Sequence, residues 1–346
     1  MLLRVNVGGD GVILGDGTLF FKVTPTPEER TMGNEEQMSR VPLPDELLAI
    51  IAQSYGLSLG QARQLDGGDE CLIWSVPSNQ GPLVVRSSPC WRSPERLAWT
   101  HRLMLSLQAV LLQVIAPLRA LDGSTLFRYN DRSVALFPYV AGAPFDREDP
   151  KLRQEAATFL ARLHATLLNR APDSAGLQHH LLIGAPPLPP APDPDSLIDL
   201  ELDIWHTTVL QKSASFSTGL IHGDYYRRNL LTEEEQIITL LYFDDLHLDF
   251  LMQEIAWSSW EFCKTEASDD WHLDRVQALL RSYREAGGLC KSEEYLAFIP
   301  FIRWRLRQEL RRHLAMVAHG LPGEPEYAAR QLRAFERLRD CHVSFA

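Results

Sequence analysis

The chain has 346 residues and a formal net charge of -11, with 45% hydrophobic and 23% charged residues, which are the proportions of an ordinary globular protein. This length is enough for one large domain or for two lobes with sizeable cores. The acidic balance argues against binding to nucleic acid or to an anionic membrane, because both require a basic surface, and it mildly favours a cationic substrate.

The first 41 residues differ in character from the rest of the chain. Apolar and polar residues alternate from Arg4 to Val23 around Gly-Asp-Gly turns, a pattern that predicts a small hairpin. The charged segment 28–40 has little that it can bury. We interpret residues 1–41 as an N-terminal appendage, partly hairpin or disordered, without a readable function.

Residues 42–140 predict a small lobe with an antiparallel sheet and few helices. Apolar residues at helical spacing predict a helix over 44–55. Strand-like segments surround a glycine turn within 63–88, and a Ser-Pro-Glu sequence at Ser93 opens another helix. A further strand over 133–140 is ended by proline and glycine, which predicts a hinge to the next lobe.

The remaining segment, 141–346, predicts a larger and mainly helical lobe. Its proline-rich stretch, 185–195, predicts an extended surface loop. The helices predicted from apolar spacing cover residues 152–167, 198–210, 253–265, 273–286, 292–318 and 326–340.

The cysteines and the apolar stretches indicate where the protein works. Five cysteines are scattered without a CxxC pair, which indicates neither a zinc site nor a disulfide framework but free thiols in a reducing compartment. The first residues lack the apolar core of a signal peptide, and the most apolar long stretch, 103–118, is too short and too polar to cross a bilayer. We therefore expect a cytoplasmic protein without a membrane partner.

Three features of the first lobe are candidates for contacts to a nucleotide. Gly67 and Gly68, between two strands, would let backbone amides approach phosphates closely, although most such pairs are simply turns. Arg86 has the charge to pair with phosphates, and an arginine exposed on an edge strand is an equally good interpretation. The segment with Phe137 and Tyr139 offers apolar walls and backbone groups for an adenine ring, or only connects the lobes.

The segment His222-Gly-Asp-Tyr-Tyr-Arg-Arg-Asn229 is the strongest candidate site in the sequence. In phosphoryl transfer, an Asp on such a loop accepts the proton of a substrate hydroxyl, and an Asn five residues later binds a magnesium ion. Asp224 is therefore the candidate base and Asn229 a candidate metal ligand, although an Asn there also occurs as a turn cap. We expect His222 to hold the loop by hydrogen bonds, and residues 225–228, including Arg227, to line the substrate side.

These motifs resemble those of the aminoglycoside phosphotransferase and choline kinase-like family. The resemblance covers roughly residues 42–320 and rests on the HxDxxxxN loop, the Gly-Gly turn and the helix Leu-Ala-Arg-Leu-His164. The helical block from Tyr283 to His313 is similar to the branch of type II homoserine kinases and stress-response kinases.

The resemblance implies a protein kinase-like α+β fold with two lobes, at 42–140 and 141–346. It also implies ATP and Mg²⁺ as cofactors. In this reading Asp224 is the catalytic base, Asn229 binds magnesium, and Arg86 takes the place of the nucleotide-binding Lys.

Three positions depart from the family pattern. Tyr242 stands where the family has a magnesium-binding Asp, and a phenol is uncharged at neutral pH and a poor magnesium ligand. Asp244, two residues further on, is expected on the same side of the strand and becomes the candidate ligand, with Asp245 as the alternative. Thr100 stands where the helical Glu that pairs with the Lys is expected. Arg86 replaces that Lys, and it keeps the charge and can grip phosphates bidentately.

The sequence thus predicts ATP- and Mg²⁺-dependent phosphorylation of a hydroxyl group on a small molecule such as an amino alcohol, an aminoglycoside or homoserine. Two alternatives stay open: a pseudokinase that binds a nucleotide or ligand with weak or no transfer, and a protein Ser/Thr kinase. Tyr242 favours the pseudokinase, because loss of one charge-stabilising group typically lowers the rate by about hundredfold. We expect a monomer or a homodimer.

Overall fold

A computed structural model describes residues 41–65, 71–170, 193–265, 270–320 and 323–341, together with two short strands nearer the N-terminus. Those strands, β1 (Val12–Ile13) and β2 (Leu19–Phe20), pair antiparallel. Internal contacts divide the chain into two compact units. Unit 1 draws on residues 1–101, 115–144 and 231–233, and unit 2 on residues 102–114, 145–230 and 234–346.

Unit 1 is built on a five-stranded antiparallel sheet with the strand order β3-β4-β5-β7-β6. Its register aligns Trp74 with Val85, and Val85 with Leu136, so these three side chains emerge on one face. The strands are β3 (Arg63–Gln64), β4 (Leu72–Val76), β5 (Leu83–Ser88), β6 (Phe127–Tyr129) and β7 (Arg132–Pro138).

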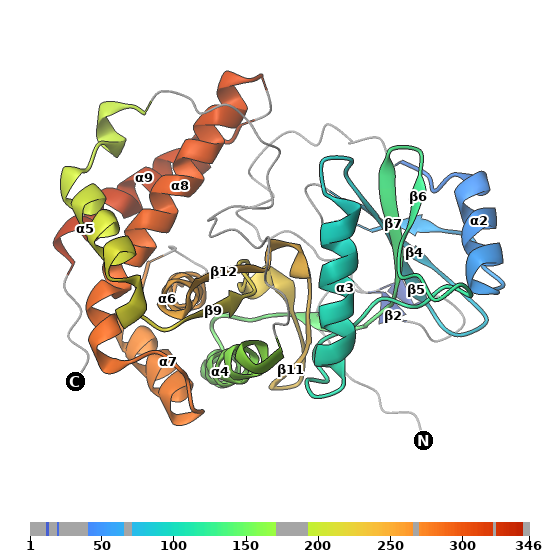
Figure 1. Cartoon of the computed structure of the whole chain (residues 1–346), viewed down its shortest axis with the longest axis horizontal. Coiled ribbons are helices and arrows are strands. Elements are labelled where there is room, and N and C mark those ends of the chain that lie inside the picture. Colours follow the sequence, from blue (N-terminus) through green and yellow to red (C-terminus); the bar gives the residue numbers. More distant parts are fainter. Residues whose placement is uncertain are drawn as a thin grey trace. The chain divides into compact units, whose positions relative to one another are not determined.

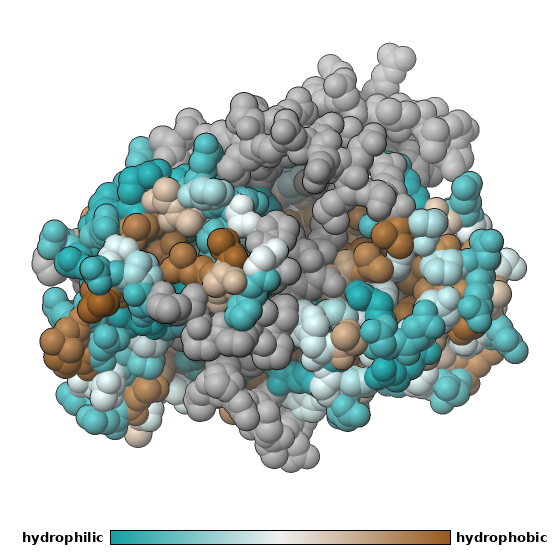
Figure 2. Space-filling view, turned by 90° about the horizontal axis from the view of Figure 1, so that it is seen from above, coloured by the Kyte–Doolittle hydropathy of each residue, from teal (hydrophilic) through white to brown (hydrophobic). Residues whose placement is uncertain are grey.

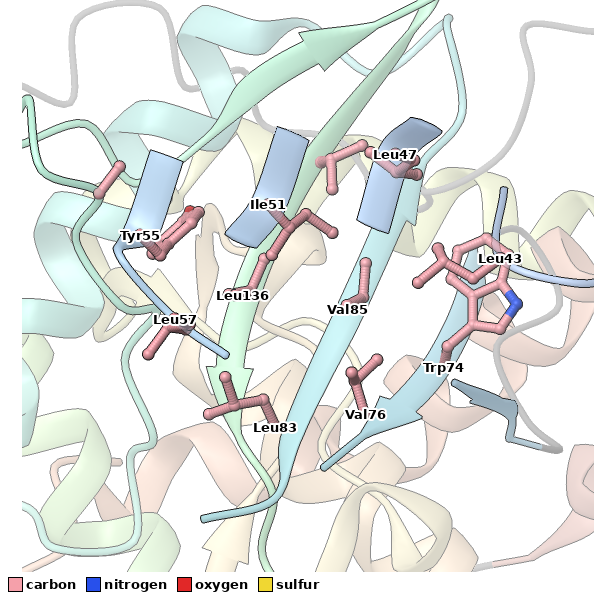
Figure 3. Close-up of a cluster of buried hydrophobic side chains, with 12 residues drawn as sticks. Leu43, Leu47, Ile51, Tyr55, Leu57, Trp74, Val76, Leu83, Val85 and Leu136 are labelled. Atoms are coloured by element: carbon pink, nitrogen blue, oxygen red, sulfur yellow. The ribbon is translucent and has the colours of Figure 1, made fainter. Parts of the chain in front are cut away.

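Helix α2 (Asp45–Tyr55) covers that face of the sheet. It points Leu47, Ile51 and Tyr55 at the sheet from successive turns, where they meet the apolar strand residues (Figure 3). Ile51 is fully buried. Burial of this cluster is the main force that holds the sheet to the helix, at about 25 cal/mol for each Å² of apolar surface removed from water.

One further helix and one further short strand follow these elements. Helix α3 (Pro94–Gln108) begins where Ser93 Oγ accepts a hydrogen bond from the Arg96 amide at 3.2 Å, as the sequence predicts. Strand β8 (Ala143–Pro144) pairs antiparallel with Leu231 and Thr232 of β10 (Leu230–Glu233).

Unit 2 is mainly helical, with α4 against α7, α6 against α8, and α8 against both α5 and α9 (Figure 1). Each helix predicted from apolar spacing is present, with ends that differ by a few residues. One difference is that residues 292–297 form a 3₁₀ turn before α8 begins. The helices are α4 (Pro150–Arg170), α5 (Leu200–Gln211), α6 (Leu251–Phe262), α7 (Leu273–Glu285), α8 (Phe298–Ala318) and α9 (Pro325–Arg337).

A small strand system in unit 2 carries the candidate site. Strands β9 (Thr218–Ile221) and β12 (His247–Phe250) pair antiparallel, with Ile221 opposite His247. Between them in the sequence lie the 3₁₀ turn η3 (Arg227–Asn229), strand β11 (Gln236–Leu240) and the 3₁₀ turn η4 (Phe243–Asp245). The candidate loop therefore starts at the end of one buried strand, and η4 leads into its partner strand.

The chain is an α+β protein with an antiparallel-sheet lobe and a mainly helical lobe, which confirms the predicted fold class. On the face shown in Figure 2, apolar residues (brown) form separate groups among hydrophilic ones (teal). None of the helices in the described ranges is both long and apolar enough to cross a membrane.

Candidate active site

Gly223 fixes the course of the candidate loop. Its φ of +84° lies in the left-handed region that side chains rarely adopt, and a Cβ there would lie 2.3 Å from the Asp245 carbonyl oxygen and 2.9 Å from the His247 ring. Only glycine permits this close approach. The contact ties the loop after β9 to the turn that contains the acidic pair Asp244 and Asp245.

A buried carboxylate, Glu254 of α6, anchors the same loop. Its Oε1 accepts a hydrogen bond from the Gly223 amide at 2.6 Å and its Oε2 one from the His222 amide at 3.1 Å. The ring of His164 on α4 adds a contact of 2.9 Å to Oε2. Burial by itself would raise the pKa of Glu254, but the hydrogen bond and charge of His164, with further contributions from His222 and Gly223, hold it below its ordinary value.

Glu254 has no role in the site predicted from the sequence. The signal available in the sequence was a single acidic residue near the start of a mainly apolar helical stretch. His164 was recognised only as part of a family motif. Its Nδ1 lies 2.8 Å from the hydroxyl of Tyr283 on α7, so one hydrogen-bonded chain links the loop to three helices.

His222 is buried and held in one tautomer. Its Nδ1 accepts a hydrogen bond from the Asp224 amide at 3.3 Å, so the proton resides on Nε2, which lies 3.0 Å from the Leu241 carbonyl oxygen. Burial lowers the pKa of His222, which favours this neutral ring. The imidazole thus bridges the loop and the segment after β11 by hydrogen bonds.

Asp224 and Asn229 are directly joined. The Asn229 amide nitrogen donates to the Asp224 carboxylate (Oδ2) at 2.7 Å and to the Asp224 carbonyl oxygen at 2.8 Å. Both amide protons are used, so the orientation of the side chain is fixed and Oδ1 is left as an acceptor. Asn229 is itself buried, and its backbone carbonyl oxygen accepts a hydrogen bond from the Leu241 amide at 2.8 Å.

The carboxyl group of Asp224 is unusually basic. Burial and then the negative charge of Asp245 raise its pKa to about 7, against the opposing effects of Arg305 and the Asn229 hydrogen bond. A carboxylate with this pKa is a better proton acceptor at neutral pH than an ordinary Asp. The arrangement is suited to proton transfer from a substrate group.

The segment after β11 is not the strand on which Tyr242 and Asp244 were expected to share one side. β11 ends at Leu240, Tyr242 adopts a left-handed conformation (φ 59°, ψ 72°), and residues 243–245 form the turn η4. Strand periodicity therefore does not decide where Asp244 points, and that part of the expectation is wrong. Asp244 is buried and its charge acts on His222, whereas half-buried Asp245 acts on Asp224 and Arg305 as well.

Arg305 of α8 is a second residue of the site that the sequence analysis did not single out. Its Nε donates to Glu309 Oε1 at 2.9 Å, and its guanidinium lies over the Trp257 ring, with the guanidinium carbon 5.3 Å from the ring centroid. Asp224 and Asp245 are both close enough to act on it electrostatically. No short motif marks this residue, and only the packing of α8 against α6 brings it to the loop.

The residues predicted to line the substrate side fall into two groups. Tyr225 is buried, and its hydroxyl donates to the Ala156 carbonyl oxygen of α4 at 2.8 Å, so the expectation that it lines a substrate is wrong. Its physical role is in the core. Arg227 is half-buried at the start of η3, and Arg228 is exposed.

Two of the nucleotide candidates share a face of the sheet in unit 1. Arg86 pairs with Ile73 and Ala135 in the register, and it alternates with Val85, so it lies on the face away from α2. Phe137 lies opposite Val84 and shares that face. The Arg86 Nη2 is 3.2 Å from Cys71 Sγ.

The other candidates in unit 1 are placed as follows. Tyr139 directly follows β7, and its amide donates to the Pro82 carbonyl oxygen at 3.1 Å. Thr100 is buried on α3, where its uncharged hydroxyl cannot replace an ion-pairing Glu. Gly67 and Gly68 lie outside the described residues.

Solved structures with the same fold define the class of protein. An amicoumacin kinase, in complex with AMP-PNP, Ca²⁺ and Ami, superposes with a TM-score of 0.64 at 14% identity over 91% of this chain and 96% of the other. A microcompartment-associated aminopropanol kinase gives 0.64 at 18% identity over 85% and 95%. A choline/ethanolamine kinase family protein from Mesorhizobium loti gives 0.55 at 15% identity over 82% and 89%. The fold is that of the protein kinase-like small-molecule phosphotransferases.

The sequence places the chain in a particular family. It belongs to the phosphotransferase enzyme family, whose sequence model matches residues 62–289. It is also similar to a homoserine kinase of Methylobacillus glycogenes, at 25% identity over 189 residues, which are 54% of this chain and 58% of that protein. The matched segment thus spans less than two thirds of the relative. The predicted family resemblance is confirmed.

Proposed function

We propose that the protein is an ATP- and Mg²⁺-dependent phosphotransferase that acts on a hydroxyl group of a small molecule. One observation carries the proposal: Asp224 has a raised pKa and is hydrogen-bonded to Asn229 on a loop anchored by buried Glu254. Membership of the phosphotransferase enzyme family supports it.

Asp224 is the proposed catalytic base. As the acceptor oxygen forms its bond to the terminal phosphorus of ATP, the hydroxyl proton passes to the Asp224 carboxylate and the bond to ADP breaks. A pKa of about 7 lets the same group give up its proton to solvent between turnovers. The amide of Asn229 orients the carboxylate by its bond to Oδ2.

The residues fit a magnesium ion bound mainly by nucleotide phosphates. No group of three or more His, Cys, Asp or Glu side chains in the described ranges is arranged to hold a metal ion. Mg²⁺ in kinases, however, is usually held by one or two protein oxygens together with phosphates. We assign Asn229 Oδ1 to it, with Asp245 preferred to the initially predicted Asp244, because Asp245 acts on Asp224. Bound Mg²⁺ would neutralise charge on the transferred phosphoryl group.

The nucleotide is proposed to bind through unit 1. Arg86 would pair with phosphates, the backbone at Gly67 and Gly68 would approach them, and Phe137 and Tyr139 would contact the adenine. The shared sheet face of Arg86 and Phe137 supports this assignment. Structures of similar fold hold AMP-PNP or ADP, which supports ATP as the donor.

A coupled assay of ADP formation tests the proposal. The purified chain is incubated with ATP, Mg²⁺ and single hydroxylated compounds, with Asp224→Asn as the matched inactive variant. ADP release that depends on one compound, on Mg²⁺ and on Asp224 is the expected result.

The alternative that Tyr242 favours is a pseudokinase, because Tyr242 replaces an expected metal ligand. It predicts that ATP raises the melting temperature while no compound releases ADP. If neither ADP release nor a nucleotide-dependent melting shift is found, both readings fail.

A further inference from the structure

Arg305 is held rigidly beside the proposed base, and its role there rests on the proposed function. The residue is only 7% exposed. Glu309 fixes its Nε at 2.9 Å and the Trp257 ring supports one face of the guanidinium. A planar guanidinium held at one edge and one face loses little further freedom when it binds a partner.

The two Nη nitrogens of Arg305 have no hydrogen-bond partner among the described residues. The side chain is nevertheless more than nine-tenths buried. Its neighbour on the same helix differs, since Arg307 bonds through Nη2 to Asp203 Oδ1 at 2.6 Å and through Nη1 to the Asp199 carbonyl oxygen at 3.4 Å. The Nη atoms keep some contact with solvent, so these donors of an otherwise buried and rigidly held guanidinium are open to a ligand.

The charge around Arg305 selects the kind of ligand. Burial alone would lower the pKa of Arg305, but Glu309, Asp224 and Asp245 outweigh it, so the guanidinium lies among three carboxyl groups. A single carboxylate can use the two Nη donors in a fork, and an ammonium group on the same molecule would be attracted by the surrounding acids.

We propose that Arg305 binds the carboxylate of the acceptor, and that the acceptor is a hydroxy amino acid whose hydroxyl faces Asp224. The carboxylate and the ammonium group of such a molecule match Arg305 and the three carboxyl groups that act on it. Arg305 is then the residue that separates amino acids from amino alcohols of otherwise identical structure.

Three matched pairs test this assignment, because the members of each pair differ only by the carboxylate. They are L-homoserine and 3-aminopropan-1-ol, L-serine and ethanolamine, and L-threonine and 1-aminopropan-2-ol. Wild-type kcat/KM should be at least about tenfold higher for the amino acid of the preferred pair. Arg305→Ala should raise KM for that amino acid about 10- to 100-fold more than KM for the amino alcohol, whereas the changed charge beside Asp224 affects kcat for both compounds alike.

Two further variants serve as controls. Arg305→Lys keeps the charge but not the fork, and should show an intermediate KM. Arg311→Ala removes a charge from the same helix, where its Nε bonds Asp193 Oδ1 at 3.0 Å, and should keep the wild-type preference. Melting temperatures of all variants show whether each one folds.

The outcomes separate this inference from the proposed function. ADP release that is equal for amino acids and amino alcohols, or a KM change in Arg305→Ala that is the same for both, overturns the role of Arg305 and leaves the phosphotransferase standing. If no compound releases ADP, the proposed function fails. Melting shifts with the three amino acids then decide the inference: a shift that is absent in Arg305→Ala supports it, and no shift overturns it.

Discussion

Replacement of Gly223 by Ala tests whether the close contact between the loop and η4 sets the geometry of the site. The new Cβ would lie 2.3 Å from the Asp245 carbonyl oxygen, whereas ordinary contact begins at 3.4 Å. The two backbone segments must therefore separate by about 1 Å. A misplacement of about 1 Å in a catalytic group can lower the rate by about 100-fold.

Gly287 offers a matched control for the backbone conformation. Its φ is also +84°, but a Cβ there meets nothing within 4 Å. Both substitutions carry the cost of a left-handed alanine, about 1–2 kcal/mol. Only Gly223→Ala adds the overpacking cost of about 1–3 kcal/mol, so we expect a total loss of about 2–5 kcal/mol.

Thermal unfolding and ADP release, measured on both variants, separate the two effects. Gly287→Ala should melt a few degrees lower than wild type, since 1 kcal/mol corresponds to about 2–4 °C in proteins of 150–250 residues and to less in longer chains, and should keep its kcat. Gly223→Ala should melt lower still and lose about 100-fold in kcat. Equal melting temperatures and equal rates for the two variants would refute the reasoning, because the left-handed φ that they share would then account for the whole loss of stability.

Further predictions concern the charged groups of the loop. Asp224→Asn should lower kcat by about 100- to 10,000-fold without lowering the melting temperature, because a neutral amide carries no penalty for burial; a drop in melting temperature would contradict this. Asn229→Ala and Asp245→Asn should each raise the Mg²⁺ concentration needed for half-maximal ADP release more than Asp244→Asn does, and the reverse order would assign the metal to Asp244. Glu254→Gln should cost about 3–5 kcal/mol at pH 7. Since its folded pKa is lowered, this stabilisation is present above about pH 4.5 and lost as the pH falls through the folded value, so melting curves of wild type and Glu254→Gln should converge in acid.

The helices could be predicted from the sequence because each carries its apolar residues at a period that matches its own geometry. Helix α2 is an example: Leu47, Ile51 and Tyr55 fall on one side at helical spacing and form the face that meets the sheet. The end of β11 could not be predicted in this way. Apolar residues continue to Phe243, so the sequence pattern does not show that the strand ends. The strand ends because Tyr242 adopts a left-handed conformation, which is usually predicted from a glycine, and no glycine stands there.

The site shows the same division between local and non-local information. Asp224 and Asn229 are joined within one short loop, so their spacing alone indicated that they act together. Glu254 and Arg305 reach the loop from helices α6 and α8, and local patterns in a single sequence do not reveal which helix packs on which loop. These contacts form only when the helices of unit 2 have packed together.

The turn after β11 also bears on the departure at Tyr242. A strand would have carried its side chains to alternate faces, and a Tyr in the metal position would then have left only Asp244 on the correct side. Because the backbone instead turns at Tyr242 and continues through η4, the acidic residues are redirected, and Asp245 rather than Tyr242 supplies negative charge beside Asp224. Loss of the Asp at position 242 is thus no sufficient reason to infer loss of the metal site. The close approach of Gly223 to the Asp245 backbone carbonyl fixes the backbone position of the metal ligand that we propose.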